Sequence, residues 1–286
     1  MRQVKIGERS VSAIGLGEMP LSVRGRPEDE GRALRTVAAS LDAGVTLIDT
    51  ADAYCLTSED FGHGEQLIAK ALAAWGGDTD QVLVATKGGH RRGPDGDWTV
   101  DGRPEYLRTA AQESAKRLGV EAIGLYQHHR PDPAVPYAET IGALAELLDA
   151  GTIQMAGISN ATVAQIDEAQ RILGGRLASV QNQFAPNFRS SEGELRHCGE
   201  IGVAFLPWSP LGGIGRSHRV ESHEAFAAVA REHGVSPQQV VLAWMLSKGD
   251  HVAPIPGSSR PETATASAEA AGLTLTPEQI ARLDAP

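Results

Sequence analysis

The stretch 46-TLIDTADAY-54 determines the expected fold, because an apolar run of strand length ends at Asp49 and passes into a polar loop that carries Tyr54. The same arrangement recurs in 82-VLVATKGG-89, which ends near Lys87, and in 123-IGLYQHHR-130, which ends near His129. An α/β barrel assembles its active site at the C-terminal ends of its strands. These four side chains are therefore predicted to gather at one end of a barrel.

Five further strand-like runs lie at residues 13–17, 154–159, 179–183, 204–208 and 253–256. Helices are expected at 28–43, 104–118 and 137–150, each followed by a glycine suited to the left-handed position after a helix. Two more helices are expected to begin with capping boxes, one from Ser236 to Gln239 and one from Thr276 to Gln279. Eight strands that alternate with helices predict an α/β protein with the (β/α)8 TIM-barrel fold. A hairpin at residues 4–11 is expected to close the barrel bottom, and residues 91–98 are expected to form a mobile loop above the strand ends.

An open, doubly wound parallel sheet is the main structural alternative, because it also alternates strands with helices. The stretch 15-GLGEMP-20 follows a strand but lacks the glycine spacing of a G-x-G-x-x-G turn. The missing dinucleotide fingerprint favours the closed barrel.

Length and composition indicate the class of protein. A chain of 286 residues fits one (β/α)8 barrel, so a single domain over residues 1–286 is the economical interpretation. The net charge of -10 disfavours binding to nucleic acid or to an anionic membrane surface. No apolar run approaches the roughly 20 residues that span a bilayer, and the N-terminal residues lack an apolar signal core, so we expect a cytoplasmic protein. No heptad or exposed apolar stripe indicates an oligomeric state.

The two cysteines, Cys55 and Cys198, are far apart and lack metal-ligand spacing. We expect them to be free, buried thiols in a reducing compartment.

The four residues at the strand ends are suited to donate a proton. Tyrosine, with an unperturbed pKa of about 10, is a weak acid at neutral pH, but a nearby ammonium stabilises its phenolate. We expect Lys87 to supply that charge and ease proton release from Tyr54. Asp49 would keep the lysine protonated, and His129 would polarise or orient the substrate oxygen. Taken singly, each residue also has a structural interpretation, as a barrel-interior ion pair, a loop aromatic or a hydrogen-bonded core histidine.

Seven motifs occur in a characteristic order: IDTADAY, VATKGG, LYQHHRPDP, GISN, SVQNQF, LPWSPLGG and PIPGSSRPE. Together they resemble the aldo-keto reductase superfamily, from the N-terminal hairpin to the last helix. The resemblance implies that Asp49, Tyr54, Lys87 and His129 are a catalytic tetrad. It also implies reduction of an aldehyde or ketone to an alcohol by hydride transfer from a nicotinamide cofactor, without a metal.

The resemblance further implies a set of cofactor-binding residues. Ser159, Asn160 and Gln181 would hydrogen-bond the nicotinamide carboxamide, and Trp208 would stack on the ring in place of the family's usual tyrosine. Two segments would lie near the phosphates, the second at the start of a helix. Their residues are Ser209, Pro210, Leu211 and Gly212 in the first, and Ser258, Ser259 and Arg260 in the second.

Arg260 with its two serines favours NADPH (NADP+) over NADH, because a 2′-phosphate prefers a guanidinium fork and hydroxyl donors. Many relatives hold the adenine with an acidic residue and an asparagine, whereas this chain has Ala266 and Ser267. NADH therefore stays open as a second cofactor.

Glu18, Met19, Trp98 and Arg130 lie in loops that are expected to reach a small aldehyde or ketone substrate. Arg130 would anchor an anionic group, and an exposed salt bridge explains it equally well. Two other functions stay open. One is a non-catalytic, NADPH-binding regulatory subunit on the same barrel, and the other is a barrel isomerase or lyase that holds substrate phosphate at residues 258–260.

Overall fold

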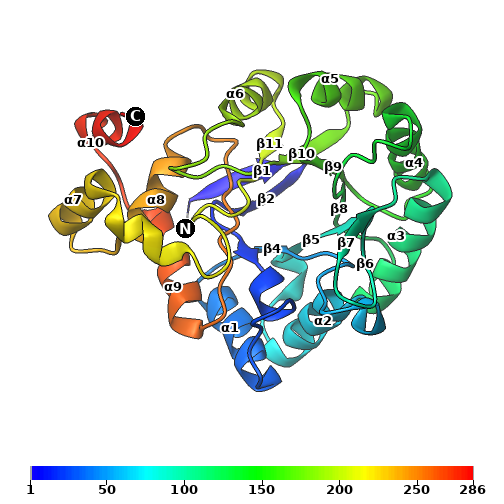
Figure 1. The fold of residues 1–286 in the computed structure, drawn as a ribbon, viewed down its shortest axis with the longest axis horizontal. Coiled ribbons are helices and arrows are strands. Elements are labelled where there is room, and N and C mark those ends of the chain that lie inside the picture. Colours follow the sequence, from blue (N-terminus) through cyan, green and yellow to red (C-terminus); the bar gives the residue numbers. More distant parts are fainter. Residues whose placement is uncertain (1, 286) are drawn as a thin grey trace.

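The computed structural model describes residues 2–285, apart from the side chain of residue 219, and shows a curved parallel sheet inside a ring of helices (Figure 1). Seven strands follow the order β11-β10-β9-β8-β5-β4-β3, and every neighbouring pair is parallel. The C-terminal ends of all seven strands therefore lie at one end of the sheet. Their bounds are β3 Leu16–Gly17, β4 Leu47–Asp49, β5 Leu83–Gly88, β8 Leu125–His128, β9 Ala156–Ser159, β10 Leu177–Gln181 and β11 Ala204–Phe205.

The eighth strand-like run closes the sheet into a barrel. The Ala253 N–H donates to the carbonyl of Phe205 in β11 (2.9 Å), and the Pro256 carbonyl accepts from the Gly17 N–H in β3 (2.9 Å). Pro254 and Pro256 have no N–H to donate back toward β3, so the run pairs on both sides without becoming a regular strand. The predicted α/β barrel is confirmed.

Helices cover the outside of the barrel, and local signals define their ends. The Ser236 and Thr276 side chains accept from the N–H groups of Gln239 and Gln279, which confirms the two predicted capping boxes. Gly119 ends the third helix in the left-handed conformation (φ 71°), as predicted. The helices are α1 Glu30–Asp42, α2 His63–Trp75, α3 Pro104–Leu118, α4 Tyr137–Asp149, α5 Val163–Ile172, α6 Glu192–Ile201, α7 Glu224–His233, α8 Pro237–Leu246, α9 Pro261–Glu269 and α10 Pro277–Asp284.

A hairpin of β1 (Gln3–Ile6) and β2 (Arg9–Ser12) closes the barrel bottom, as expected. The apolar side chains of this hairpin pack in one core with Leu47 and Leu125 from the barrel strands. Buried strand residues on the other face pack against the helices. The hairpin fills the bottom with apolar side chains, so the polar residues of the barrel interior gather toward the opposite end.

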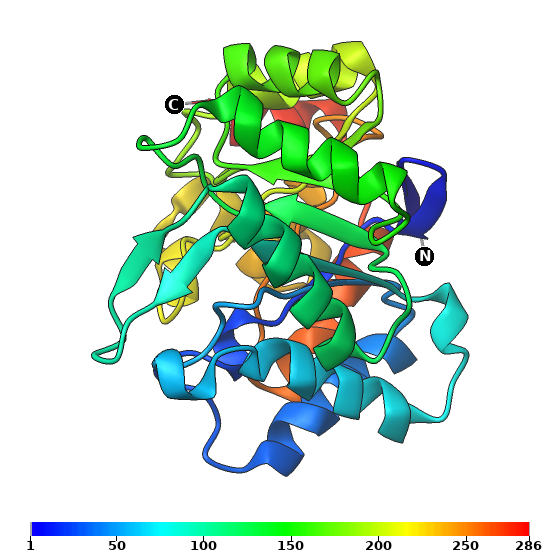
Figure 2. The same ribbon diagram turned by 90° about the vertical axis from the view of Figure 1, so that its right-hand side faces the viewer.

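A second hairpin projects from that opposite end (Figure 2). It consists of β6 (His90–Arg92) and β7 (Trp98–Val100), so residues 91–98 lie above the strand ends as expected but belong to a hairpin instead of an irregular loop. The turn residues between the strands are polar and rich in glycine, a composition that predicts a loop, so the short strands on either side were not recognised. The Arg92 guanidinium lies 3.9 Å from the centre of the Trp98 ring and donates to the Gly96 carbonyl (2.7 Å), which holds the hairpin together.

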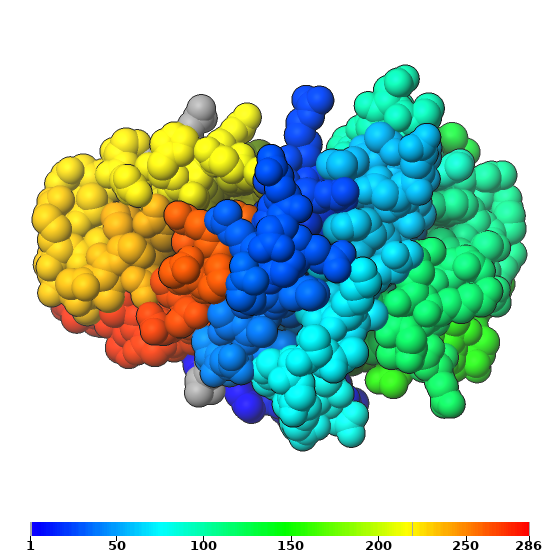
Figure 3. Space-filling model, turned by 90° about the horizontal axis from the view of Figure 1, so that it is seen from below, coloured from blue at the N-terminus to red at the C-terminus, as the bar shows by residue number. Residues whose placement is uncertain are grey.

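The first and last barrel helices meet at the seam where the barrel closes. Helix α1 lies between α9 and α2, as Figure 3 shows for the blue, orange and cyan parts of the surface. Both cysteines are buried and free, as expected. In the part of the chain that the structure describes, no helix has the length and apolar character to cross a membrane. That residues 1–286 form one domain stays a prediction.

Candidate active site

The N-terminus of α2 holds the loop that carries Tyr54. The backbone N–H of Gly62 donates to the Asp52 carbonyl (2.7 Å), and the N–H of Gly64 donates to the Tyr54 carbonyl (3.0 Å). The first N–H groups of a helix have no partner within the helix, so carbonyls of a neighbouring loop can satisfy them. The loop after β4 is thereby fixed over the strand ends.

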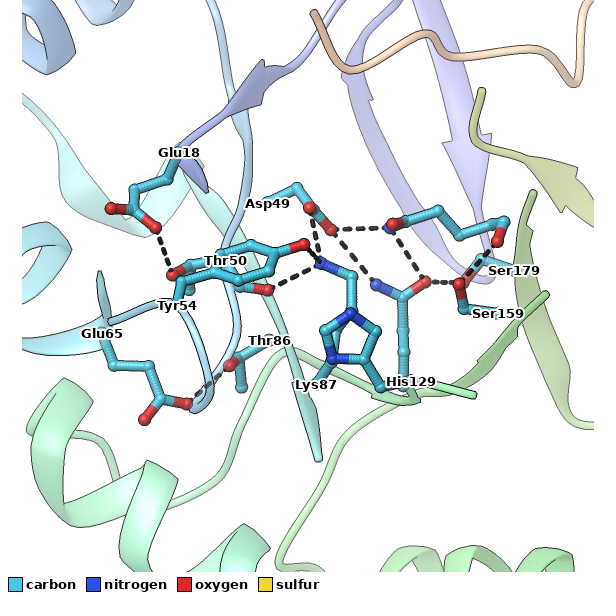
Figure 4. Close-up of polar contacts among 12 residues, drawn as sticks. Glu18, Asp49, Thr50, Tyr54, Glu65, Thr86, Lys87, His129, Ser159 and Ser179 are labelled. Carbon is cyan, nitrogen blue, oxygen red and sulfur yellow. Dashed lines mark hydrogen bonds and ion pairs between the residues drawn. The ribbon is translucent and has the colours of Figure 1, made fainter. Parts of the chain in front are cut away.

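The four residues predicted from the sequence come together at this end of the barrel (Figure 4). Lys87 Nζ donates to Asp49 Oδ2 (2.6 Å), to the Thr50 carbonyl (2.8 Å) and to the Tyr54 hydroxyl (3.1 Å). Lys87 is fully buried, and these three acceptors match the three N–H donors of its ammonium. The His129 ring lies edge-on to Tyr54, with 5.7 Å between ring centroids.

Electrostatics define the protonation states of this group. Burial opposes the charge on Lys87, but Asp49 and Tyr54 outweigh that effect and raise its pKa above 10.5. Burial and the charge of Lys87 lower the pKa of His129 well below 6.5, so its imidazole is neutral. The site therefore contains a permanent ammonium and a neutral imidazole at neutral pH.

Lys87 lowers the pKa of Tyr54, as expected from the sequence, but burial has the larger effect. Burial raises the pKa of Tyr54 to about 12, and the opposing effect of Lys87 is smaller. Burial removes the water that stabilises a phenolate, and the attraction of one ammonium does not fully replace that stabilisation. Tyr54 therefore carries its proton throughout the neutral range.

A buried amide network supports Asp49 from the side opposite Lys87. Gln181 Nε2 donates to Asp49 Oδ1 (2.7 Å), and Gln127 Nε2 donates to the same oxygen (3.3 Å). Gln127 was not identified from the sequence. The sequence did contain a signal, because Gln127 is two residues before His129 and alternate residues of a strand share one face. In the structure, Gln127 pairs with Lys87 in the register of β5 and β8. Both carboxylate oxygens of Asp49 therefore have partners.

A cavity of about 1020 Å³ extends from these residues to the start of α9. Of the predicted residues, Glu18 and Gly212 do not line it. Lys87 lies behind Tyr54 instead of on the wall. The predicted residues that line the cavity are Met19, Asp49, Tyr54, Trp98, His129, Arg130, Ser159, Asn160, Gln181, Trp208, Ser209, Pro210, Leu211, Ser258, Ser259 and Arg260.

Two of the wall residues hold an uncommon backbone conformation. Asn160 has a φ of 58° and Ser209 a φ of 51°, both in the left-handed region that few non-glycine residues adopt. The Asn160 amide donates to the His129 carbonyl and to Ser159 Oγ, both at 3.0 Å. Ser159 and Asn160 do not cap the following helix, because Thr162 is the N-cap of α5. Their polar groups are instead part of the cavity wall.

At the far end of the cavity, Arg260 is the N-cap residue of α9 and is exposed. Ser258 beside it is buried, and its hydroxyl donates to the Arg260 carbonyl (3.0 Å). Between this end and Tyr54, Trp208 lines the wall with a buried indole nitrogen that has no hydrogen-bond partner among the described residues. This end of the cavity therefore combines a cation, hydroxyls and a helix N-terminus.

The wall near Tyr54 also contains His90, which the sequence did not single out. Its ring lies 4.6 Å from the His129 ring and 4.7 Å from the Trp98 ring. Burial and the charge of Arg130 lower the pKa of His90 to about 4, so its imidazole is neutral. His128 lies on the opposite face of its strand from His129, and the centre of its ring lies 6.2 Å from that of the Tyr137 ring.

Residues 13–286 match the family model described as Aldo/keto reductase family. An uncharacterized oxidoreductase of Schizosaccharomyces pombe is 33% identical over 98% of this chain and 88% of its own length. A 6-dehydroglucose reductase of Novosphingobium aromaticivorans is 34% identical over 94% of this chain and 89% of its own length. The solved structure of the glycerol dehydrogenase of Gluconobacter oxydans has a TM-score of 0.84 and 25% identity, and the match covers 99% of this chain and 94% of that one.

Proposed function

Because this chain belongs to the aldo/keto reductase family of oxidoreductases, we propose that it reduces aldehydes or ketones to alcohols with Tyr54 as the general acid. NADPH is the proposed reductant. The contact of 3.1 Å between the Tyr54 hydroxyl and Lys87 Nζ is the observation that supports this function most directly. It gives the phenolate formed by proton donation an ammonium partner in a buried setting.

The residues of the cavity fit a nicotinamide dinucleotide. A volume of about 1020 Å³ is at the upper end of the range for small-molecule and cofactor sites. Gln181 uses its Nε2 on Asp49, so its Oε1 is left to accept from a carboxamide, with Ser159 and Asn160 beside it. Trp208 would offer its ring to the nicotinamide, and the segments 209–212 and 258–260 would hold the phosphates. When bound, the cofactor supplies the hydride that adds to the carbonyl carbon.

The chain's own residues act on the carbonyl oxygen. That oxygen becomes negatively charged as the carbonyl is reduced, and the Tyr54 Oη proton moves to it. Lys87 stabilises the resulting phenolate, and Asp49 keeps the charge on Lys87. Neutral His129 orients the substrate oxygen through a ring N–H, without adding a second proton donor of higher acidity.

Stopped-flow absorbance of NADPH mixed with a simple aldehyde tests the proposal. We expect NADPH to be consumed, with alcohol formed in equal amount. Tight NADPH binding without turnover of any aldehyde or ketone in a broad panel would favour the regulatory-subunit alternative. Failure to bind NADPH at all, seen as unquenched tryptophan fluorescence, would contradict both and favour a phosphate-binding isomerase or lyase.

Arg260→Gln is expected to raise the KM for NADPH by about 10- to 100-fold and to leave the KM for NADH nearly unchanged. The reason is that a charged hydrogen bond to the 2′-phosphate contributes about 1.5–3 kcal/mol, which NADH cannot use. The measurement is steady-state kinetics with both cofactors. Arg171→Gln, at an exposed arginine in the last turn of α5, is the matched control. An equal rise for both cofactors would rule out recognition of the 2′-phosphate.

Arg130→Gln is expected to raise the KM for succinic semialdehyde by roughly tenfold and to change the KM for butanal little. Arg130 lines the cavity beside His129, is exposed, and has no ion pair among the described residues. Its guanidinium is therefore free to bind a carboxylate on the substrate. The two aldehydes are compared at saturating NADPH. Equal effects on both would show that Arg130 does not select for charge.

A further inference from the structure

One buried carboxyl group beside the site has no role in the mechanism above. Glu18 follows β3, is fully buried and does not line the cavity. Its carboxylate accepts from the hydroxyls of Ser22 and Thr50, the latter at 3.0 Å. Both hydroxyl residues are themselves fully buried. Burying a carboxyl group reduces the stability of the folded protein unless the group has hydrogen-bond partners. The Ser22 and Thr50 hydroxyls are such partners for Glu18.

The first turn of α2 closes over this carboxyl group. Gly64 lies there without a side chain, and a Cβ at that position would be 2.6 Å from Glu18 Oε2 and 2.8 Å from Thr50 Oγ1. Only a glycine leaves room for the pair. The N–H of Gly64 also donates to the Tyr54 carbonyl (3.0 Å). The same residue therefore packs against Glu18 and holds the loop that carries Tyr54.

Thr50 connects Glu18 to Lys87, the partner of Tyr54 (Figure 4). Its hydroxyl binds the Glu18 carboxylate, while its backbone carbonyl accepts from Lys87 Nζ (2.8 Å). The Glu18 N–H also donates to the Asp49 carbonyl (2.8 Å). Toward the surface, the Ser22 hydroxyl contacts Nδ1 of half-buried His63 (2.8 Å). Glu18 thus lies between buried Lys87 and Tyr54 on one side and half-buried His63 on the other.

Glu18 changes its charge in the neutral range. Burial raises its pKa to about 7, against the hydrogen bonds of Ser22 and Thr50 and the attraction of Lys87, while Asp49 adds to the rise. Of the neighbouring groups, Tyr54 and Lys87 keep their protons across this range. The pKa of Tyr54 is about 12, that of Lys87 lies above 10.5, and burial lowers the pKa of His63 below 6.5.

We propose that Glu18 is a positioning residue whose charge controls how readily Tyr54 releases its proton, acting through Thr50 and Lys87. This inference rests on the proposed reductase function. An ionised Glu18 disfavours the Tyr54 phenolate and raises the pKa of Tyr54. Protonation of Glu18 removes that repulsion and makes Tyr54 the stronger acid. The rate of carbonyl reduction is therefore highest below pH 7 and falls as the pH rises through about 7.

Single-turnover reduction of an aldehyde, at saturating NADPH and aldehyde and over pH 5 to 9, tests the proposal. In the wild-type enzyme we expect the rate to fall by about 3- to 10-fold as Glu18 ionises, and we call this fall the pH step. It is equivalent to a rise of roughly half to one unit in the pKa of Tyr54. Glu18→Gln keeps the size of the side chain and one of its two acceptor oxygens but has no charge. The step is expected to disappear in this variant, with the rate staying at the low-pH value.

Asp52→Asn is the matched control. Asp52 is another fully buried carboxyl group of this region, and its oxygens form no side-chain hydrogen bond among the described residues. Burial and the charge of Glu65 raise its pKa well above 3.8. The step should persist in Asp52→Asn. A step that persists in Glu18→Gln, or disappears with Asp52, would overturn the assignment to Glu18.

Carboxyl ¹³C NMR on protein labelled at glutamate gives a second readout that needs no turnover. A resonance that titrates near pH 7 in the wild type and is absent in Glu18→Gln is the expected result. If that resonance is present and the enzyme reduces no carbonyl compound, the proposed function fails while the ionisation of Glu18 stands. If turnover is normal and no glutamate titrates near pH 7, the inference fails and the function stands.

Discussion

Tyr54→Phe is expected to lower the turnover number for aldehyde reduction by about a hundredfold to ten-thousandfold, the usual contribution of a general acid. The variant loses only the hydroxyl that lies 3.1 Å from Lys87 Nζ. Tyr54 is buried between the loop and the strand ends, so phenylalanine fits the same space. NADPH binding should be nearly unchanged, because the predicted cofactor contacts lie elsewhere on the wall. The measurements are steady-state kinetics and a fluorescence titration with NADPH.

Tyr126→Phe is the matched control for this substitution. Tyr126 is fully buried on β8, and its hydroxyl has no partner among the described residues. Removing that hydroxyl should leave turnover close to that of the wild type. A Tyr54→Phe enzyme with wild-type turnover would refute Tyr54 as the acid.

Lys87→Met is expected to abolish measurable turnover and to reduce the free energy of unfolding by about 3–5 kcal/mol, the usual cost of removing one partner of a buried ion pair. The side chain of Lys87 is 0% exposed and that of Asp49 is 3% exposed, so water cannot replace the lost ammonium. Asp49 would keep its two amide donors but would lose its counter-ion. Chemical denaturation at neutral pH measures the loss.

The double variant Asp49→Asn with Lys87→Met removes both charges and should recover a large part of the stability without recovering turnover. Because the pKa of Lys87 in the folded protein lies above its ordinary value of 10.5, the stabilising effect of its charge is complete below that value. It is lost as the pH rises through the pKa of the folded protein. The stability difference from the wild type should therefore stay constant from neutral pH to about pH 9. A double variant no more stable than Lys87→Met would show that the ion pair is not the cause.

Much of the fold follows from short-range signals. The capping boxes at Ser236 and Thr276 and the glycine at position 119 depend on interactions within a few residues, so the sequence predicted them at the correct positions. Strand ends were less certain. The run at 13–17 contributes only β3, Leu16–Gly17, to the sheet, and the run at 204–208 contributes only β11. Pairing with neighbours decides where a strand ends, and neighbours come from distant parts of the chain.

The candidate site shows the same division. The order of residues along the strands placed Asp49, Tyr54, Lys87 and His129 at one end of a barrel, because parallel strands present their C-terminal ends together. The hairpin at 90–100 escaped prediction, because its two strands are three residues long and their pairing is not coded by an alternating apolar pattern.

The order of residues along the chain therefore determined that Asp49, Tyr54, Lys87 and His129 meet, because the periodicity of strands and the signals that end helices are local properties. Tertiary structure decided the pKa values of the side chains in the site. Burial raises the pKa of Tyr54 to about 12 although a lysine adjoins it, and it raises that of Glu18 to about 7. The extent of dehydration depends on every segment packed around a group, including the first turn of α2 over Glu18. No stretch of sequence near a residue records that environment.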